Sequence, residues 1–479
     1  MFDAKVFQSK TLSEKVTTKE KILGFFLGPV AVMLMNSILT NYLNVYYTDV
    51  LALNNVWGGA FLGTFPIVAK ILDVLTFILM GKVIDRTKTS QGKARPWLLL
   101  SAPLLSICMI MLFVVPTGNE DLTAIWIFFS YTVFYAVAFT MYSTAHSLMV
   151  PLATSDAKER EKLSTISNTP GMLAGSLSAV LFPMLILPRI GVARSGWLSV
   201  MVVTAIAAFP IILLEYFYTR ERVTEKKWKE DEKEESGEKK PKAMSLRRQM
   251  KICLKSRMWV LLMIYVIVSQ IINALFSASA IYYCNWVLGS YNDGITQAMF
   301  YTLGQFPMGV GLFLVGPASA RFGKKKFISF GFLLAFAGVI LCVAEPGNLP
   351  IVLIGQVVRS LGIIPGAYLF QGLFGDSLDD IEKKSGERCD GFASSIFNCI
   401  VTLSGGIALF IFNIGIAKLG YVAPIGSMNV LQPDQVKSFI IFCVMGIQLV
   451  AYPVMAVLFM LFPDYELEGE VRRASATLL

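Results

Sequence analysis

Two apolar runs in the second half of the chain decide the fold class. Residues 326–344 read KFISFGFLLAFAGVILCVA, and residues 349–375 read LPIVLIGQVVRSLGIIPGAYLFQGLFG, with EPGN between them. A helix needs about 20 apolar residues to cross a bilayer core of about 30 Å. Each run has that length and a single charged residue, Lys326 or Arg359. Each run therefore predicts a membrane-spanning helix.

The rest of the chain repeats this pattern. Of the 479 residues, 55% are hydrophobic and 16% are charged, whereas about a quarter of the residues in a soluble protein are charged. The sequence predicts an all-α membrane protein with about twelve transmembrane helices. We expect them at residues 22–47, 56–82, 96–115, 122–150, 165–188, 196–217, 257–286, 295–318, 326–344, 349–375, 389–417 and 436–463.

The charges of the loops predict the orientation. Basic residues gather in the N-terminal tail, in the second–third, fourth–fifth and eighth–ninth loops, and in the C-terminal tail. Opposite loops such as PTGNEDLT (116–123) carry no Lys or Arg, with Arg189 and Arg194 in the fifth–sixth loop as the exception. Because basic loops stay in the cytoplasm, we expect a multi-pass protein of the cell membrane with both termini cytoplasmic. The 42 Lys and Arg against 33 Asp and Glu then set orientation and do not indicate nucleic-acid binding.

A long hydrophilic stretch separates six spans from six. Mixed charge without apolar periodicity is typical of a solvated linker, and a docking helix within it is the alternative. We divide the chain into an N-terminal six-helix bundle, a charged cytoplasmic linker, a C-terminal six-helix bundle and a cytoplasmic tail, at residues 1–217, 218–256, 257–463 and 464–479. Glycine and basic residues follow the second span of each half, which indicates a parallel duplication.

Several segments carry a family resemblance. They are YYTDVLAL (46–53), AKILDVLTFILMG (69–81), GKVIDRTKTSQGKARPW (81–97), VPLATSDAKEREKL (150–163), IYYCNWVLG (281–289) and DSLDDIEKKSGERCDG (376–391). Together they resemble the glycoside, pentoside and hexuronide cation symporters of the melibiose permease type, within the major facilitator superfamily, over nearly the whole chain. The resemblance implies two six-helix bundles and alternating-access transport of a sugar or glycoside with Na⁺, Li⁺ or H⁺.

Asp73 is the only acid in the apolar run of the second span. A carboxylate inside the membrane is a functional candidate by default, and the resemblance implies that it couples cation transport; an ion pair with Lys70, three residues earlier, is the structural alternative. Melibiose-type members have a second acid where this chain has Phe77 and a lysine where it has Thr402. Since Na⁺ needs several oxygen ligands, a lone carboxylate favours H⁺ as the coupling ion, with uncoupled diffusion as the alternative. We expect no bound metal and no other cofactor.

The charged sugar contacts that the resemblance implies are replaced here, because they fall at Met33, Ser143, Ser147 and Asn168. A mostly neutral polar set remains on the spans that would line a central cavity. Hydrogen bonding between helices is the alternative role for such residues. The candidate substrate contacts are Asn36, Thr40, Asn44, Ser143, His146, Ser147, Asn168, Gln270, Asn273, Arg359, Asn398 and Thr402.

Two members of this set are ionisable. His146, the only histidine, titrates near neutrality and suits a proton relay, and a hydrogen-bonded core histidine is the alternative. Arg359 suits either an anionic group of the substrate or a carboxylate of the protein, and the sequence leaves both open.

The predicted cytoplasmic loops carry further charges. By the resemblance, these latch the two halves together, and solvated loop charge is the alternative. The candidate gate residues are Asp85, Arg86, Lys93, Arg95, Arg160, Asp376 and Arg388.

The sequence therefore predicts a secondary active transporter of a sugar, glycoside or similar polar small molecule. Its expected partners are that substrate and the lipid bilayer, and the family's usual state is a monomer. The alternatives are a transporter of an amphiphile or organic anion, an uncoupled facilitator and, last, a non-transporting sensor. We do not expect an enzyme, because no nucleophile and base motif, metal-ligand spacing or large soluble domain is present.

Overall fold

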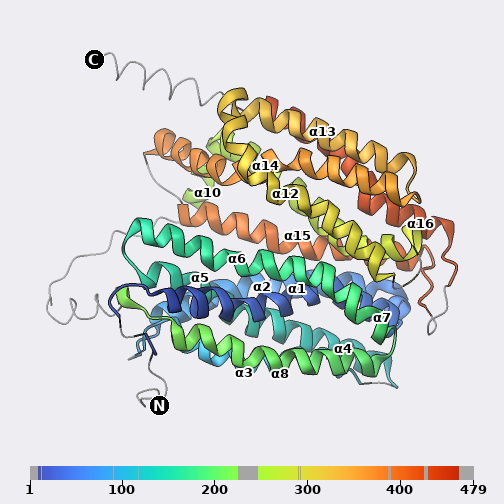
Figure 1. Cartoon of the computed structure of the whole chain (residues 1–479), viewed down its shortest axis with the longest axis horizontal. Coiled ribbons are helices and arrows are strands. Elements are labelled where there is room, and N and C mark those ends of the chain that lie inside the picture. The colour runs from blue at the N-terminus through green and yellow to red at the C-terminus, as the bar shows by residue number, and fades with distance from the viewer. Residues whose placement is uncertain are drawn as a thin grey trace. The chain divides into compact units, whose positions relative to one another are not determined.

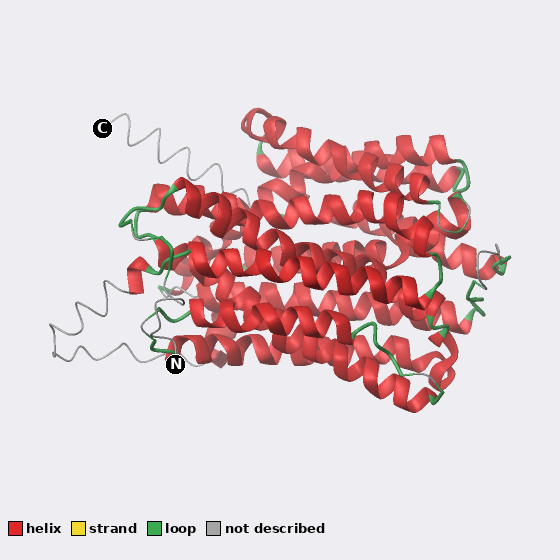
Figure 2. Cartoon of the chain, turned by 60° about the horizontal axis from the view of Figure 1, so that its bottom comes forward, coloured by secondary structure: helices red, strands yellow, loops and turns green. Residues whose placement is uncertain are grey.

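A computed structural model of the chain describes residues 9–11, 13–89, 91–116, 118–224, 246–289, 291, 293–386, 390–424 and 430–462. Within these residues the chain is helical and contains no strand beyond one isolated bridge, Thr89 with Gly92. Figure 2 shows the helices joined by loops. All twelve predicted spans lie on helices, so the predicted fold class is confirmed.

The helices form two compact units, unit 1 (Met1–Lys240 with Tyr421–Leu431) and unit 2 (Pro241–Gly420 with Gln432–Leu479). In unit 1 the α-helices are α1 (Gly28–Val45), α2 (Ala60–Arg86), α3 (Arg95–Met111), α4 (Glu120–Thr132), α5 (Thr140–Ala153), α6 (Ala157–Leu181), α7 (Leu187–Ile190) and α8 (Arg194–Tyr218) (Figure 1). Single π-helical or 3₁₀ segments extend or join them at Glu20–Leu27, Tyr46–Val50, Leu53–Gly59, Val133–Phe139 and Phe182–Ile186.

Unit 2 has the same make-up. Its helices are α10 (Leu246–Lys255), α11 (Arg257–Tyr283), α12 (Gly294–Phe322), α13 (Lys324–Ala344), α14 (Leu349–Ser385), α15 (Asp390–Lys418), α16 (Asp434–Ile441) and α17 (Ile447–Met460), with π-helical segments at Cys284–Leu288 and Phe442–Gly446. The helix α14 continues ten residues past the predicted end of its span, through the polar sequence 376–385.

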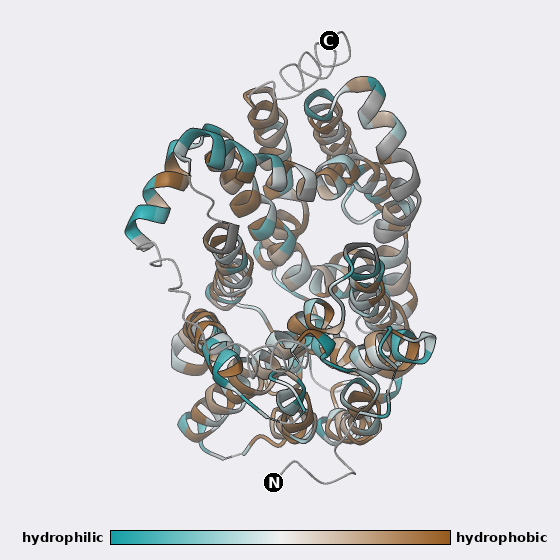
Figure 3. Cartoon of the chain, turned by 90° about the vertical axis from the view of Figure 1, so that its left-hand side faces the viewer, coloured by the Kyte–Doolittle hydropathy of each residue, from teal (hydrophilic) through white to brown (hydrophobic). Residues whose placement is uncertain are grey.

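Nine helices of the described residues are long and apolar enough to cross a membrane, and Arg95–Met111 is a shorter apolar helix. Their outer faces are apolar: on α8, Val203 and Ile206 are about two-thirds exposed, whereas Met201 and Ala205 are fully buried. A soluble protein rarely exposes contiguous apolar surface, so these faces fit contact with lipid. Figure 3 shows hydrophobic residues along the helices and hydrophilic residues at many of the helix ends and turns.

Close helix packing fixes the polar residues of both units. In unit 1, α1 packs against α6 and α8, and α3 packs against α8 and α5. In unit 2, α14 packs against α13 and α12. The α13–α14 contact is a glycine seam, since a Cβ on Gly338 would lie 2.4 Å from the backbone nitrogen of Arg359 and one on Gly362 would lie 2.3 Å from that of Ala335. Small residues allow membrane helices to approach this closely.

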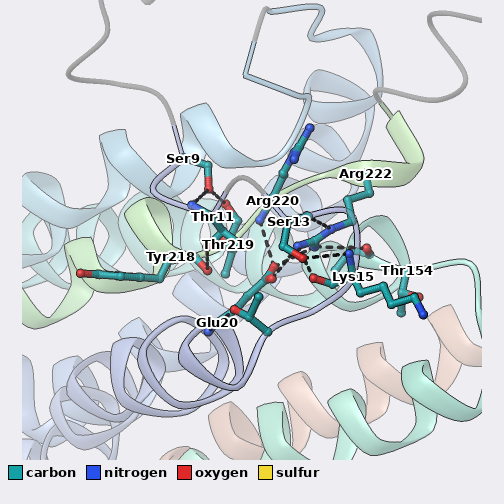
Figure 4. Close-up of polar contacts among 12 residues, drawn as sticks. Ser9, Thr11, Ser13, Lys15, Glu20, Thr154, Tyr218, Thr219, Arg220 and Arg222 are labelled. Atoms are coloured by element: carbon teal, nitrogen blue, oxygen red, sulfur yellow. Dashed lines mark hydrogen bonds and ion pairs between the residues drawn. The ribbon is translucent and has the colours of Figure 1, made fainter.

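The predicted linker begins later than expected. The prediction of a solvated segment from 218 is wrong for its first residues, because Thr219, Glu221 and Thr224 are buried in unit 1. Arg222 forms a bidentate ion pair with Glu20, at 3.0 Å from Nη1 to Oε1 and 2.7 Å from Nη2 to Oε2. Its guanidinium also donates to the carbonyls of Ser13 and Lys15 (Figure 4). Residues 225–245 and the predicted tail 464–479 lie outside the described residues, and Leu246–Lys255 of the predicted linker forms α10.

Candidate functional site

The predicted coupling residue, Asp73, lies in the middle of α2 and is 3% exposed. Lys70 Nζ lies 2.8 Å from its Oδ2 and also faces the Tyr135 ring, 4.2 Å from the centroid. The other oxygen, Oδ1, is buried and has no hydrogen-bond partner among the described residues. The ion pair expected as the structural alternative is therefore present, and it satisfies only one of the two carboxylate oxygens.

Of the polar candidates of the first span, Asn36, Thr40 and Asn44, one lies beside this cluster. The Thr40 side chain on α1 lies close to the Tyr135 hydroxyl, and the Tyr135 ring faces Lys70, the partner of Asp73. Asn36 and Asn44 lie one turn on either side of Thr40, and both are partly exposed. Thr40 is thus the candidate of the first span that the structure brings to the Tyr135–Lys70–Asp73 cluster.

His146 lies in a buried polar cluster between α5, α6 and α8. Its Nδ1 lies 2.6 Å from Glu215 Oε1, and its Nε2 lies 3.2 Å from Ser167 Oγ. The Tyr142 hydroxyl donates to Glu215 Oε2 at 2.6 Å, and its ring stacks on the imidazole. Because a carboxylate only accepts hydrogen bonds, His146 donates through Nδ1 when Glu215 is ionised. This arrangement fits the hydrogen-bonded core histidine.

Glu215 is the residue that sequence reasoning missed. It is completely buried, and a Cβ on Gly28 of α1 would lie 2.7 Å from its own Cβ. The sequence carried the signal, since Glu215 is the single acid in the apolar run AIAAFPIILLEYFY (205–218). The criterion that selected Asp73 therefore also selects Glu215.

The other candidates of unit 1 make local contacts. Ser143 and Ser147 donate to the carbonyls of Thr140 and Thr144, three residues earlier on α5. Asn168 is exposed and reaches Ser164 at 3.5 Å on its own helix. Local bonds of this kind leave the side chains on the helix surface. The structure does not gather these three with Asp73 or His146.

Arg359 is the buried charge of unit 2 and is 5% exposed. Its Nε donates to Gln356 Oε1 at 2.7 Å and its Nη1 donates to the Tyr452 hydroxyl at 3.4 Å. The guanidinium carbon lies 4.8 Å from the centre of the Phe276 ring. Among the described residues, these partners are all neutral.

The remaining candidates of unit 2 lie on two helices. Gln270 on α11 is partly exposed and Asn273 is exposed, and Phe276, which covers Arg359, follows Asn273 by one turn. Asn398 and Thr402 on α15 are exposed and partly exposed. The packing of α11 against α15 places the two helices side by side.

Of the predicted gate charges, Arg95 is buried within unit 1. Its guanidinium donates to the carbonyl of Tyr216 at 3.0 Å and lies over the Tyr216 ring. Glu221 accepts hydrogen bonds from the backbone N–H groups of Lys93, Ala94 and Arg95, at 2.8 to 2.9 Å. A carboxylate at the N-terminus of a helix is favoured by the helix dipole. Arg95 is therefore not an exposed gate charge, and its contacts with Tyr216 hold α3 to α8.

The other gate candidates are more exposed. Lys93 pairs with Asp85 at 3.2 Å, and Lys324 pairs with Asp376 at 3.1 Å. Arg86 and Arg160 are exposed, and Arg160 donates to the Thr154 carbonyl. Arg388 lies outside the described residues. A search of the described residues for three or more His, Cys, Asp or Glu side chains able to hold a metal ion found none.

Comparison with known proteins gives a consistent family. A putative glycoside/cation symporter of Escherichia coli (strain K12) is 24% identical over 91% of this chain and 90% of its own length. The isoprimeverose transporter of Lactiplantibacillus pentosus is 25% identical over 84% of this chain and 80% of its own length. The crystal structure of a D-xylose-proton symporter matches 93% of this chain and 98% of its own with a TM-score of 0.62 at 14% identity, which supports the fold.

The family model described as MFS/sugar transport protein matches residues 24–464. This match covers both six-helix halves and includes Asp73, His146, Glu215 and Arg359. The chain therefore belongs to the MFS/sugar transport protein family and is a membrane transporter, not an enzyme.

Proposed function

We propose that this chain moves a sugar or glycoside across the cell membrane by alternating access, coupled to H⁺ through Asp73. The family supports secondary transport of a sugar. The names of the isoprimeverose transporter and of the putative glycoside/cation symporter support a glycoside as the cargo. The loop charges support an orientation with both termini in the cytoplasm, and we propose that the protein works as a monomer.

The state of Asp73 carries this proposal. Its carboxylate is buried at mid-helix, its Oδ2 meets Lys70, and its Oδ1 has no hydrogen-bond partner among the described residues. A proton on Oδ1 removes the negative charge and weakens the ion pair, which leaves Lys70 held by the Tyr135 ring alone. A buried carboxylate is costly while charged, so protonation and helix rearrangement are energetically linked. This linkage is what a symporter requires.

The choice of H⁺ over Na⁺ rests on the ligands around Asp73. Na⁺ is a hard cation that needs several oxygen ligands. The side chain four residues later is Phe77, and the Thr76 hydroxyl already donates to the carbonyls of Leu72 and Asp73. Asp73 therefore supplies the only carboxylate of this cluster among the described residues, and a proton needs no more than that.

Proteoliposomes with a pH gradient test the proposal. Purified protein is reconstituted, and uptake of radiolabelled isoprimeverose, D-xylose and methyl glucoside is measured with the inside alkaline, with and without Na⁺. We expect accumulation that follows the pH gradient, ignores Na⁺ and falls at least about tenfold in Asp73→Asn, while exchange at equal concentrations continues. Glu120→Gln, an exposed acid of the same unit at the start of α4, is the control and should accumulate normally.

Two outcomes argue against parts of this proposal. Gradient-driven accumulation in Asp73→Asn equal to wild type would remove Asp73 as the coupling residue. Saturable uptake that only equilibrates, whatever the pH gradient, would indicate an uncoupled facilitator.

A further inference from the structure

The buried charge of unit 2, Arg359, has no acidic partner among the described residues. Between residues 257 and 462 the sequence has no Asp or Glu inside any predicted span apart from Asp390, two residues into the eleventh; the stretches 294–344, 346–375 and 391–433 contain none. On its own helix the next acid is Asp376, 17 residues after Arg359, which is about 25 Å along an α-helix. Asp376 is already paired with Lys324. Arg359 therefore has no carboxylate within reach on α14.

Such a charge is expensive to bury. An arginine stays protonated in proteins, and an unpaired charge inside a membrane protein costs several kcal/mol unless a partner or water stabilises it. The guanidinium has five N–H groups, and the described contacts use Nε with Gln356 and Nη1 with Tyr452. At least three N–H groups remain for another acceptor.

A second buried donor points to the same place. Gln356 Nε2 has no hydrogen-bond partner among the described residues. The orientation of the amide is fixed, since its oxygen must be the atom that accepts from Arg359 Nε. Buried amide N–H groups are nearly always paired in native structures, so we expect Gln356 Nε2 to bind an acceptor. The two groups without an acceptor, Gln356 Nε2 and Arg359 Nη2, belong to side chains already joined by a hydrogen bond.

The neighbouring helix α12 has no side chain at the position that faces them. A Cβ added at Gly304 would lie in van der Waals contact, 4.0 Å from Arg359 Nη2 and 3.9 Å from Gln356 Oε1. On the other side, Phe276 of α11 covers the guanidinium and stands one helical turn from the exposed Asn273. A ligand that contacts Asn273 therefore lies next to the ring that covers Arg359.

We infer that Arg359 and Gln356 form an oxyanion subsite, and that the cargo is a sugar derivative bearing a carboxylate, sulfonate or phosphate that binds there. A planar guanidinium matches two oxygens of such a group, and the Gln356 amide supplies a further donor to it. This inference rests on the proposed sugar transport and narrows its substrate class. The shared chemistry is an oxyanion, and its sources are the cargo or a free inorganic anion.

The first experiment uses the wild-type protein. Thermal unfolding of the purified transporter is followed with four hexoses that differ at carbon 6: D-glucose, D-glucuronate, 6-deoxy-6-sulfoglucose and glucose 6-phosphate. Sodium sulfate and sodium phosphate form the separate arm for a free anion. We expect at least one sugar anion to raise the unfolding midpoint and to be taken up by proteoliposomes, with D-glucose at least about tenfold weaker.

The second experiment uses variants at the subsite. In Arg359→Gln we expect affinity for the sugar anion to fall about 10- to 100-fold, as expected for loss of a charge-assisted contact. Gln356→Glu places a carboxylate of the protein beside Arg359, so this variant should fold well and should also lose affinity for the sugar anion. It keeps the test available if Arg359→Gln does not fold. Arg321→Gln, an exposed arginine of the same unit, is the control and should bind normally.

Each other result has a definite meaning. If neutral and anionic sugars are transported equally and Gln356→Glu changes neither, the oxyanion subsite is overturned while the proposed sugar transport stands. If inorganic sulfate or phosphate stabilises the protein as much as every sugar anion does, the site holds a free ion and not the cargo. If no sugar of either kind binds or is transported, the proposed function itself fails.

Discussion

The two units treat their buried charges differently. In unit 1 the two acids buried within α2 and α8 each contact a basic side chain: Asp73 contacts Lys70 at 2.8 Å, and Glu215 contacts His146 at 2.6 Å. In unit 2 the mid-helix base, Arg359, has only neutral partners among the described residues. A charge that is neutralised inside its own unit can serve the fold, whereas a charge left uncompensated is available to a molecule that comes and goes.

The largest effect is expected at the Glu215 cluster. Glu215→Leu leaves His146 and Tyr142 buried without their acceptor, and we expect a loss of about 3 to 5 kcal/mol in unfolding free energy. The triple replacement Glu215→Leu, His146→Leu and Tyr142→Phe should recover most of this loss, because no buried polar group is then left without its partner. Unfolding in detergent, followed by tryptophan fluorescence, measures both. A single variant as stable as wild type would contradict a structural pairing.

Replacement of Arg359 should change the unfolding free energy in the opposite direction. Replacing Arg359 with Met removes an uncompensated charge, so in the absence of cargo we expect the protein to gain about 1 kcal/mol of stability while losing transport, as stabilising changes at functional sites often do. The same unfolding measurement applies. A loss comparable to that of Glu215→Leu would mean that Arg359 is neutralised within the protein and would erase the contrast between the units.

Glu221 gives an intermediate effect. Its carboxylate accepts from three backbone N–H groups at the start of α3, and Glu221→Ala should cost about 1 to 2 kcal/mol, as for other helix N-terminal partners. Glu345→Ala, an exposed acid at the end of α13, is the matched control and should change stability little. Equal losses in both variants would argue that the contact to α3 adds nothing.

The smallest effect is expected at the Lys93–Asp85 pair. The Asp85 side chain is 69% exposed, and exposed ion pairs contribute about 0 to 1 kcal/mol. Asp85→Asn should therefore leave the unfolding midpoint unchanged at physiological salt. A clear loss that disappears in high salt would instead indicate a charge network at this end of unit 1.

Much of the fold could be predicted from the sequence because membrane spans are marked by composition. Run length placed the twelve predicted spans on helices of the described residues, and the lone acid in the apolar run of the second span, Asp73, is buried. The contacts could not be predicted in the same way. Glu215 and His146 are 69 residues apart and meet only through the tertiary packing of α5 and α8, where Gly28 of α1 also comes close to Glu215.

The site residues show the same limit. The sequence predicted polar residues of α1 and α5 as substrate contacts, but it cannot separate a side chain that hydrogen-bonds to its own helix, such as Ser147, from one that lies beside another helix, such as Thr40. The start of the linker was misjudged for a related reason. TRERVT (219–224) is as polar as the residues that follow, and only the tertiary contacts of Glu221 and Arg222 separate it from them.

Those contacts determine where the chain can be divided. A first-half fragment that ends at Phe217 would lack Glu221, which accepts hydrogen bonds from the start of α3, and Arg222, which pairs with Glu20. We expect this fragment to be poorly folded. A fragment that ends at Thr224 keeps both. For co-expression of the two halves as separate polypeptides, or for insertion of a fluorescent protein between them, the junction therefore belongs after Thr224 and before α10.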